Sequence, residues 1–246
     1  MQGNVLERNE CPMFSSIAVV VAAVALTSTL VGGCATKSKQ SEIVLLSPDG
    51  FKLSATVYGE GPKGIVLAHD DKSNKAFLAP LAYYLSQHGF RVMTFNFRGY
   101  EGSEGVPDPA LMDRDVVGAG LSLVRNFGVR EVSYVGFGTG ALIVAKAATS
   151  PDLAPRTLVL TGLPASYGTI EASKVLPPLF LPKLFMVPSG DDSLIERTKE
   201  LMNLAPNPKE LYVYPANENW FDPNSAVSIE GSGIAKLVDY LRREGR

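Results

Sequence analysis

Short apolar runs alternate with longer segments of helical periodicity along most of this chain, and this alternation limits the possible folds. The expected strands are 42–47, 52–59, 64–70, 91–97, 131–136, 157–162, 183–188 and 210–215. The expected helices are 77–90, 110–128, 141–150, 193–203 and 233–243. Alternation at this spacing predicts an α/β fold with a mostly parallel, doubly wound sheet. The turn signal "PDG" (48–50) joins the first two strands into an N-terminal antiparallel hairpin.

The composition is typical of one globular domain. The chain has 246 residues, of which 46% are hydrophobic, so it can bury a large core. Its formal net charge of −2 provides no electrostatic attraction to nucleic acid, and no nucleic-acid partner is expected. Its two cysteines, Cys11 and Cys34, both precede the alternating region, so no disulfide framework is indicated.

An uncharged stretch, "IAVVVAAVALTSTL" (17–30), is followed by "VGGC" (31–34). The stretch is short for a membrane-spanning helix and suits the apolar core of a signal peptide. Small residues directly before a cysteine resemble the lipobox of bacterial lipoproteins. The resemblance implies cleavage after Gly33 and an acyl group on Cys34. It also implies a place in the bacterial cell envelope, at the outer membrane in a two-membrane bacterium because Ala35 is not aspartate.

The residues before this stretch do not match a signal peptide as well. Glu7, Arg8 and Glu10 make them mildly acidic, whereas such a segment is usually basic; translation from Met13 would remove the conflict. An uncleaved anchor is the alternative. We therefore expect a signal peptide at 1–33, a polar tether at 34–41 and one folded domain at 42–246, with membrane lipid as a partner through acylated Cys34.

The segment "VGFGTGAL" (135–142) follows an expected strand and opens an expected helix. Its glycines fit the dinucleotide loop G-x-G-x-x-(G/A), with Ala141 in the last place. They also fit the nucleophile elbow of hydrolases, G-x-S-x-G, with Gly138 in place of serine. A dinucleotide loop usually follows the first strand, and the next strand ends in an acidic residue. Here the loop follows the fifth strand and the next one ends in Thr161 and Gly162, so the context favours the elbow.

Five segments between residues 42 and 246 resemble the α/β-hydrolase family in the family's order. The segment "LAHD" (67–70) resembles the family's "HG" turn, and "FNFRGYEGSEG" (95–105) resembles its "RG-x-G-x-S-x-G" loop except at Glu101. Residues 132–148 resemble its strand, nucleophile elbow and helix. Residues 184–192 resemble the segment that carries the catalytic acid, and 210–220 the segment that carries the catalytic histidine. The resemblance is to lidless dienelactone hydrolases and serine esterases, because few residues separate the sixth strand from the seventh.

The resemblance implies a catalytic triad that this chain lacks. Carried over by position, the serine is Gly138, the acid is Asp192 (or Asp191) and the histidine is Asn219. Glycine has no side chain to acylate, and a carboxamide does not accept a proton near neutral pH. Losing the nucleophile or the base of a triad costs on the order of a million-fold in turnover. The triad positions are therefore expected to be catalytically degenerate.

The resemblance also assigns oxyanion-type positions to His69, Asp70 and Thr139. Thr139 is expected to begin the helix and offer its N–H rather than act as a nucleophile. The other histidine, His88, is expected at the opposite end of the sheet, where it cannot replace the missing base.

Several acidic residues follow expected strands, and the carboxyl ends of parallel strands meet at one edge of the sheet. They are Asp70, Asp71, Asp191, Asp192 and Glu218. With His69 they offer conceivable ligands for a divalent cation. Solvated loop carboxylates and helix N-caps explain them more simply, so no metal and no cofactor are expected.

These observations predict a lipid-anchored α/β-hydrolase-fold protein that has lost serine-hydrolase catalysis and binds an unidentified small molecule or protein at a membrane surface. Two alternatives stay open. One is a weak or non-serine hydrolase of ester or acyl substrates that uses the acidic residues. The other is a nucleotide-binding protein that uses the GFGTG loop.

Overall fold

The computed structural model describes residues 39–217 and 232–244, all within the compact unit Lys37–Arg246. The expected signal peptide, Cys34, Glu218 and Asn219 lie outside the described residues.

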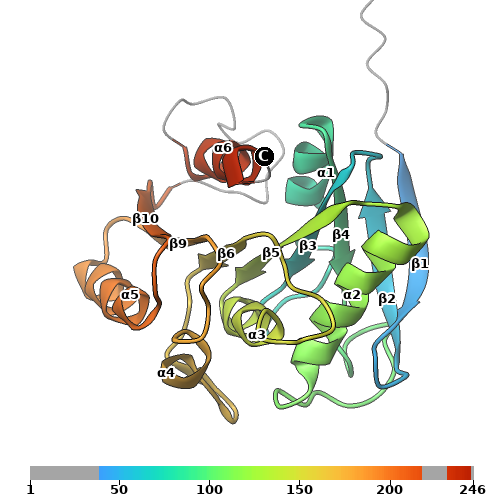
Figure 1. Cartoon of the computed structure of the whole chain (residues 1–246), viewed down its shortest axis with the longest axis horizontal. Helices are drawn as coiled ribbons and strands as arrows, with labels where there is room; N and C mark the ends of the chain where they lie inside the picture. The colour runs from blue at the N-terminus through green and yellow to red at the C-terminus, as the bar shows by residue number, and fades with distance from the viewer. Residues whose placement is uncertain (1–38, 218–231, 245–246) are drawn as a thin grey trace, which may run out of the picture. The chain divides into compact units, whose positions relative to one another are not determined.

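An eight-stranded sheet has the order β1-β2-β4-β3-β5-β6-β9-β10. β1 and β2 pair antiparallel and β2 pairs antiparallel with β4, whereas the other neighbours are parallel (Figure 1). The strands are β1 Gln40–Leu46, β2 Lys52–Tyr58, β3 Lys63–Ala68, β4 Phe90–Phe95, β5 Glu131–Phe137, β6 Leu158–Thr161, β9 Lys183–Pro188 and β10 Lys209–Tyr214. The predicted parallel α/β sheet with an N-terminal antiparallel hairpin is confirmed.

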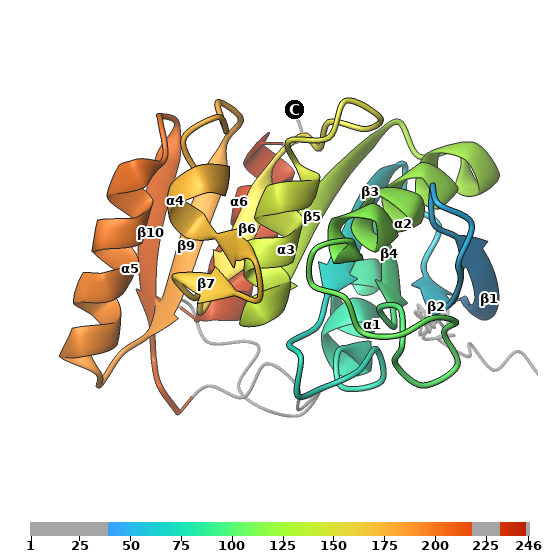
Figure 2. The same ribbon diagram turned by 90° about the horizontal axis from the view of Figure 1, so that it is seen from below.

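Helices cover both faces of this sheet, as its continuous apolar strands require. α2, α3, α4 and α5 lie on one face, and α1 and α6 lie on the other (Figures 1 and 2). The helices are α1 Ala79–Gln87, α2 Met112–Phe127, α3 Thr139–Ala147, α4 Ala172–Val175, α5 Asp192–Leu204 and α6 Gly233–Glu244.

The segment between β6 and β9 contains small elements that the sequence analysis did not predict. Two-residue strands, β7 Ser166–Tyr167 and β8 Ile170–Glu171, form a hairpin that leads into the single turn of α4. Elements this short carry no measurable periodicity. They form no separate domain, so the described residues include no large lid. No helix in the described part of the chain is long and apolar enough to cross a bilayer.

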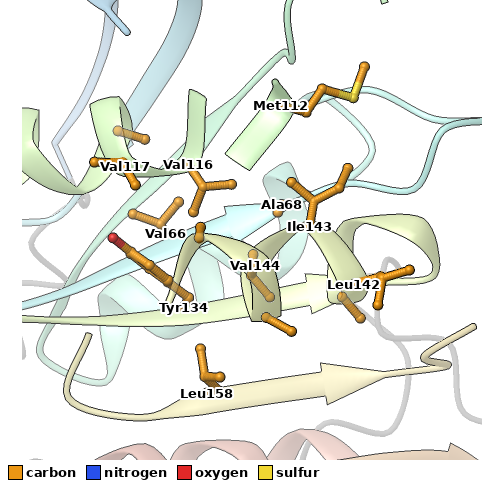
Figure 3. Packing of buried hydrophobic residues seen from close by; sticks show 14 of the residues in the cluster. Val66, Ala68, Met112, Val116, Val117, Tyr134, Leu142, Ile143, Val144 and Leu158 are labelled. Carbon is orange, nitrogen blue, oxygen red and sulfur yellow. The ribbon is translucent and has the colours of Figure 1, made fainter. Parts of the chain in front are cut away.

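Tyr134 carries a polar atom into the larger of the two apolar clusters. The residue is fully buried on β5, among Val66, Val116 and Val144 and other apolar side chains (Figure 3). Its hydroxyl has no hydrogen-bond partner among the described residues, and burial raises the pKa of the phenol. A buried hydroxyl without a partner destabilises the folded state by about 1–3 kcal/mol.

Tyr134→Phe should therefore raise the free energy of unfolding, by about 1 kcal/mol, because it removes the unpaired hydroxyl and leaves the ring. Tyr240→Phe is the matched control, since the buried Tyr240 hydroxyl is hydrogen-bonded to Thr157 Oγ1 at 2.9 Å. The free energy of unfolding of Tyr240→Phe should fall by about 1 kcal/mol. Urea unfolding measures both, and equal losses in the two variants would contradict the prediction.

A buried arginine joins three segments beside the sheet. Arg98, 2% exposed, follows β4 and donates from Nε and Nη2 to Asp115 on α2, which is 0% exposed. Nη1 and Nη2 donate to the two carboxylate oxygens of Asp49 in the β1–β2 turn, at 2.9 and 3.0 Å. The guanidinium carbon lies 4.7 Å from the centre of the Phe51 ring. The loop after β4 is thereby held against both the hairpin and α2.

The pairing of Asp49 predicts a pH dependence of stability. Burial acts to raise the pKa of Asp49, but hydrogen bonds from Arg98 and Ser47 outweigh it and lower the pKa from 3.8 to about 2. An acid with a lower pKa in the folded state binds fewer protons there than in the unfolded chain. Its stabilising contribution is therefore complete above pH 3.8 and is lost as the pH falls through about 2.

Asp49→Asn should accordingly be less stable than the native chain at about pH 5, and this difference should shrink as the pH approaches about 2. Urea midpoints across this range measure it. Asp152→Asn, at an exposed aspartate, is the control and should track the native chain. A stability difference between Asp49→Asn and the native chain that stays constant with pH would contradict the lowered pKa of Asp49.

Candidate functional site at the carboxyl edge of the sheet

The turn between β5 and α3 is formed by Gly138, whose φ of 53° and ψ of −124° are unfavourable for a residue with a side chain. The Gly138 N–H donates to the carbonyl of Thr161 at the end of β6, at 2.9 Å. Gly140 is needed for another reason, because a Cβ on it would lie 2.4 Å from the carbonyl oxygen of His69. The helix therefore begins in close contact with the segment that follows β3.

A carboxylate occupies the space beside Gly138. A Cβ placed on Gly138 would lie 1.6 Å from Asp70 Oδ2, so no side chain fits at position 138 while Asp70 keeps this position. The same Oδ2 accepts from the Thr139 N–H at 3.1 Å, and Oδ1 accepts from the Lys72 N–H at 3.1 Å. Asp70 thus places its negative charge at the N-terminus of α3, where the helix dipole stabilises an anion.

Further hydrogen bonds hold the loop after β3 in this position. The Asp71 N–H donates to Thr139 Oγ1 at 2.8 Å. The Tyr100 hydroxyl, from the loop after β4, donates to the Asp71 carbonyl at 3.0 Å. Burial raises the pKa of Tyr100, and the neighbouring Tyr167 of the β7–β8 hairpin adds to this effect. Three loops that follow different strands therefore meet around Asp70 and Asp71.

Asp70 and Asp71 interact as a pair of carboxyl groups. Partial burial acts to raise the pKa of Asp70, but hydrogen bonds from Asp71 and from the N–H groups of Lys72 and Thr139 outweigh it and lower the pKa. The hydrogen bond to Asp70 raises the pKa of Asp71, and burial adds to this effect. When the two groups share one proton, Asp71 therefore holds it and Asp70 is the carboxylate.

His69 is fully buried and both of its ring nitrogens are engaged. Its Nδ1 lies 2.7 Å from the Asp70 carbonyl oxygen, and its Nε2 accepts from the Phe97 N–H at 3.4 Å. The ring makes edge-on contacts with Phe97 and Tyr100, each at 4.9 Å between centroids. Burial lowers the pKa of His69, so the ring is neutral near pH 7. The ring packs against Phe97 and Tyr100 and holds the turn after β3 in position.

Within the described residues, neither position carried over for the acid makes a hydrogen bond with Asp70. Asp191 caps α5, accepting from the Leu194 N–H at 2.9 Å, and Asp192 is exposed in the first turn of that helix. Asn219 and Glu218 lie outside the described residues. Within 39–217 and 232–244, no three potential metal ligands are clustered. His88 ends α1, next to the start of β4.

Known structures resemble this one closely. An esterase of Pyrococcus furiosus aligns over 85% of this chain and 92% of its own, with a TM-score of 0.69 and 15% identity. A dienelactone hydrolase of Anabaena variabilis aligns over 84% and 96%, with a TM-score of 0.65 and 16% identity. The chain has the α/β-hydrolase fold.

A serine hydrolase of Xanthomonas campestris, described as lacking a lid, shares this fold over 85% of this chain and 94% of its own, with a TM-score of 0.62 and 19% identity. No protein-family profile matches the chain, and no curated protein matches it in sequence.

The α/β-hydrolase fold gives the contact between Asp70 and Gly138 a chemical meaning. The sequence resemblance described above would place the glycine of the family's "HG" turn at position 70 and its serine at position 138, whereas this chain has aspartate at 70 and glycine at 138. The sequence analysis noted the departure at position 138 but not the one at position 70, and it did not connect the two positions, which are 68 apart in numbering.

The contact predicts that substitutions at the two positions are coupled. Gly138→Ala should cost about 3 kcal/mol of stability in the native chain, through backbone strain and displacement of Asp70. In an Asp70→Gly background the same change should cost about 1 kcal/mol less, because only strain remains. Chemical denaturation of the four proteins of this cycle measures the coupling.

Gly162→Ala is the matched control. Gly162 also has a positive φ, of 63°, but a Cβ there would approach nothing closer than the Gly138 nitrogen at 4.0 Å. The stability cost of Gly162→Ala should be the same whichever residue occupies position 70. A Gly138→Ala cost that is equal in both backgrounds would mean that Asp70 does not fill the space.

Proposed function

We propose that this chain is a lipid-anchored α/β-hydrolase-fold protein that has lost serine-hydrolase catalysis and acts by binding at a membrane surface. The observation that carries the proposal is the position of Asp70. Its Oδ2 accepts from the Thr139 N–H, the amide that follows the nucleophile position, and fills the space in which a serine side chain would begin.

This arrangement opposes acyl transfer at two steps. Position 138 provides no nucleophile. In addition, an ester carbonyl that developed negative charge beside Thr139 would meet the Asp70 carboxylate instead of a free N–H. Oxyanion donors and binding alone retain roughly a thousand- to ten-thousand-fold acceleration in hydrolases that have lost the triad. Here an oxyanion donor is also engaged, so less than this is expected.

The membrane part of the proposal rests on the lipobox-like segment before Cys34. Cys34→Ala should abolish acylation and leave the full-length precursor uncleaved, because the acyl acceptor is lost. Intact-mass measurement of the purified protein, beside a Cys11→Ala control that should still be acylated, tests this directly. A Cys34→Ala protein that still carried lipid would rule out the proposed anchor.

Turnover of short-chain nitrophenyl esters by residues 35–246 tests the loss of catalysis. The native chain and the Gly138→Ser/Asn219→His variant should be inactive, the second because Asp70 still blocks the elbow. Adding Asp70→Gly should raise turnover at least about a hundredfold, because it frees the space and the Thr139 N–H together. Turnover by the native chain would overturn the proposal.

A second candidate is a hydrolase that uses a carboxylate in place of the triad, and the position of Asp70 at the elbow favours it. The carboxylate would take a proton from a water molecule as that water attacked the substrate carbon. Asp70→Asn separates the two candidates, since it would abolish turnover by a carboxylate enzyme and leave a binding protein unchanged.

Nucleotide binding through the GFGTG loop has less support. A phosphate at the N-terminus of α3 would need the Thr139 N–H that Asp70 already occupies, and the two negative charges would repel each other. Thermal stabilisation by a dinucleotide would reverse this preference.

A further inference from the structure

β1 is an edge strand with one face exposed. Among the described strands it pairs with β2 alone, and its exposed side chains alternate along this face as Gln40, Glu42, Val44 and Leu46. Val44 is 68% exposed and Leu46 is 61% exposed, whereas Leu45 between them points into the core. Two large apolar side chains therefore stand together at this edge.

A groove of about 430 Å³ adjoins this strand, between β1 and α2. Val44 and Leu46 line it together with Leu121 and the exposed Arg125 of α2. We call the exposed Val44 and Leu46 side chains the β1 patch. They point to the sheet face opposite α2, whereas Leu121 and Arg125 flank the same edge from the α2 side. Apolar side chains with a cation nearby suit the interfacial region of a phospholipid layer.

The chain length before β1 indicates which partner the patch meets. Five residues, 35–39, separate Cys34 from Gln40, so the two are at most about 20 Å apart even if fully extended. A domain of about 200 residues has a diameter of about 40 Å, so an acyl group on Cys34 would keep the start of β1 within about half a domain diameter of the bilayer.

The opposite edge of the sheet is farther from the anchor. β10 lies seven strand spacings from β1, which is about 34 Å. Lys37 adds positive charge before β1 and favours approach of the near edge to anionic lipid, whereas Lys39 is ion-paired with Glu60.

We infer that the β1 patch rests on the phospholipid surface to which Cys34 is anchored. This inference rests on the acylation proposed above. It assigns the domain one orientation, with β1 against the lipid and β10 away from it.

The test uses the full chain, processed in a bacterial host and reconstituted in vesicles of phosphatidylethanolamine and phosphatidylglycerol with brominated acyl chains. Val44→Cys or Val213→Cys carries a thiol-reactive fluorophore; Val213, 39% exposed on β10, is the matched control at the far edge. Processing removes Cys11 and acylation blocks Cys34, so the label is specific. Quenching by the brominated lipid should be at least about twofold stronger at position 44.

Two further measurements on the same samples separate the possible failures. If the intact mass lacks the acyl group, the anchor and the orientation are overturned together. If the protein is acylated and sediments with vesicles but both labels are quenched equally, only the orientation is overturned. A dimer in which position 44 is shielded from brominated lipid would assign the patch to a second copy of the chain and also overturn the inference.

Discussion

The buried guanidinium of Arg98 joins the β1–β2 turn, the loop after β4 and helix α2. An arginine at this depth is stable only if its charge is matched, and Asp115 and Asp49 together provide that match. The consequence extends to the candidate site, because the loop held by Arg98 carries Tyr100, which fixes the Asp71 carbonyl. The position of the Asp70 carboxylate therefore depends on an ion pair outside the site.

Asp70 and Gly138 form one structural unit. The glycine permits the backbone turn and leaves room for the carboxylate, and the carboxylate binds the N-terminus of the helix that the turn begins. A helix N-terminus in an α/β fold commonly binds an anion supplied by a ligand. In this chain the anion is part of the protein, and it stabilises the turn between β5 and α3.

The sequence predicted the fold well because the strands are buried on both faces and the helices are long. Elements without periodicity were missed, such as the β7–β8 hairpin that places Tyr167 beside Tyr100. The sequence also identified Gly138 and Asp70 separately. Their contact could not be predicted, since it depends on the side-chain direction of Asp70 and on the approach of two loops, neither of which leaves a local pattern. Asp191 was expected as a possible N-cap, and it caps α5.

The contact between positions 70 and 138 limits which single substitutions the chain tolerates at either position. A serine introduced at 138 meets the carboxylate, and a glycine introduced at 70 uncovers a turn that still has no nucleophile. Neither single substitution provides both a nucleophile and room for it, and the first also weakens the fold. Under the proposed function, selection for esterase activity therefore begins from libraries that vary positions 70, 138 and 219 together.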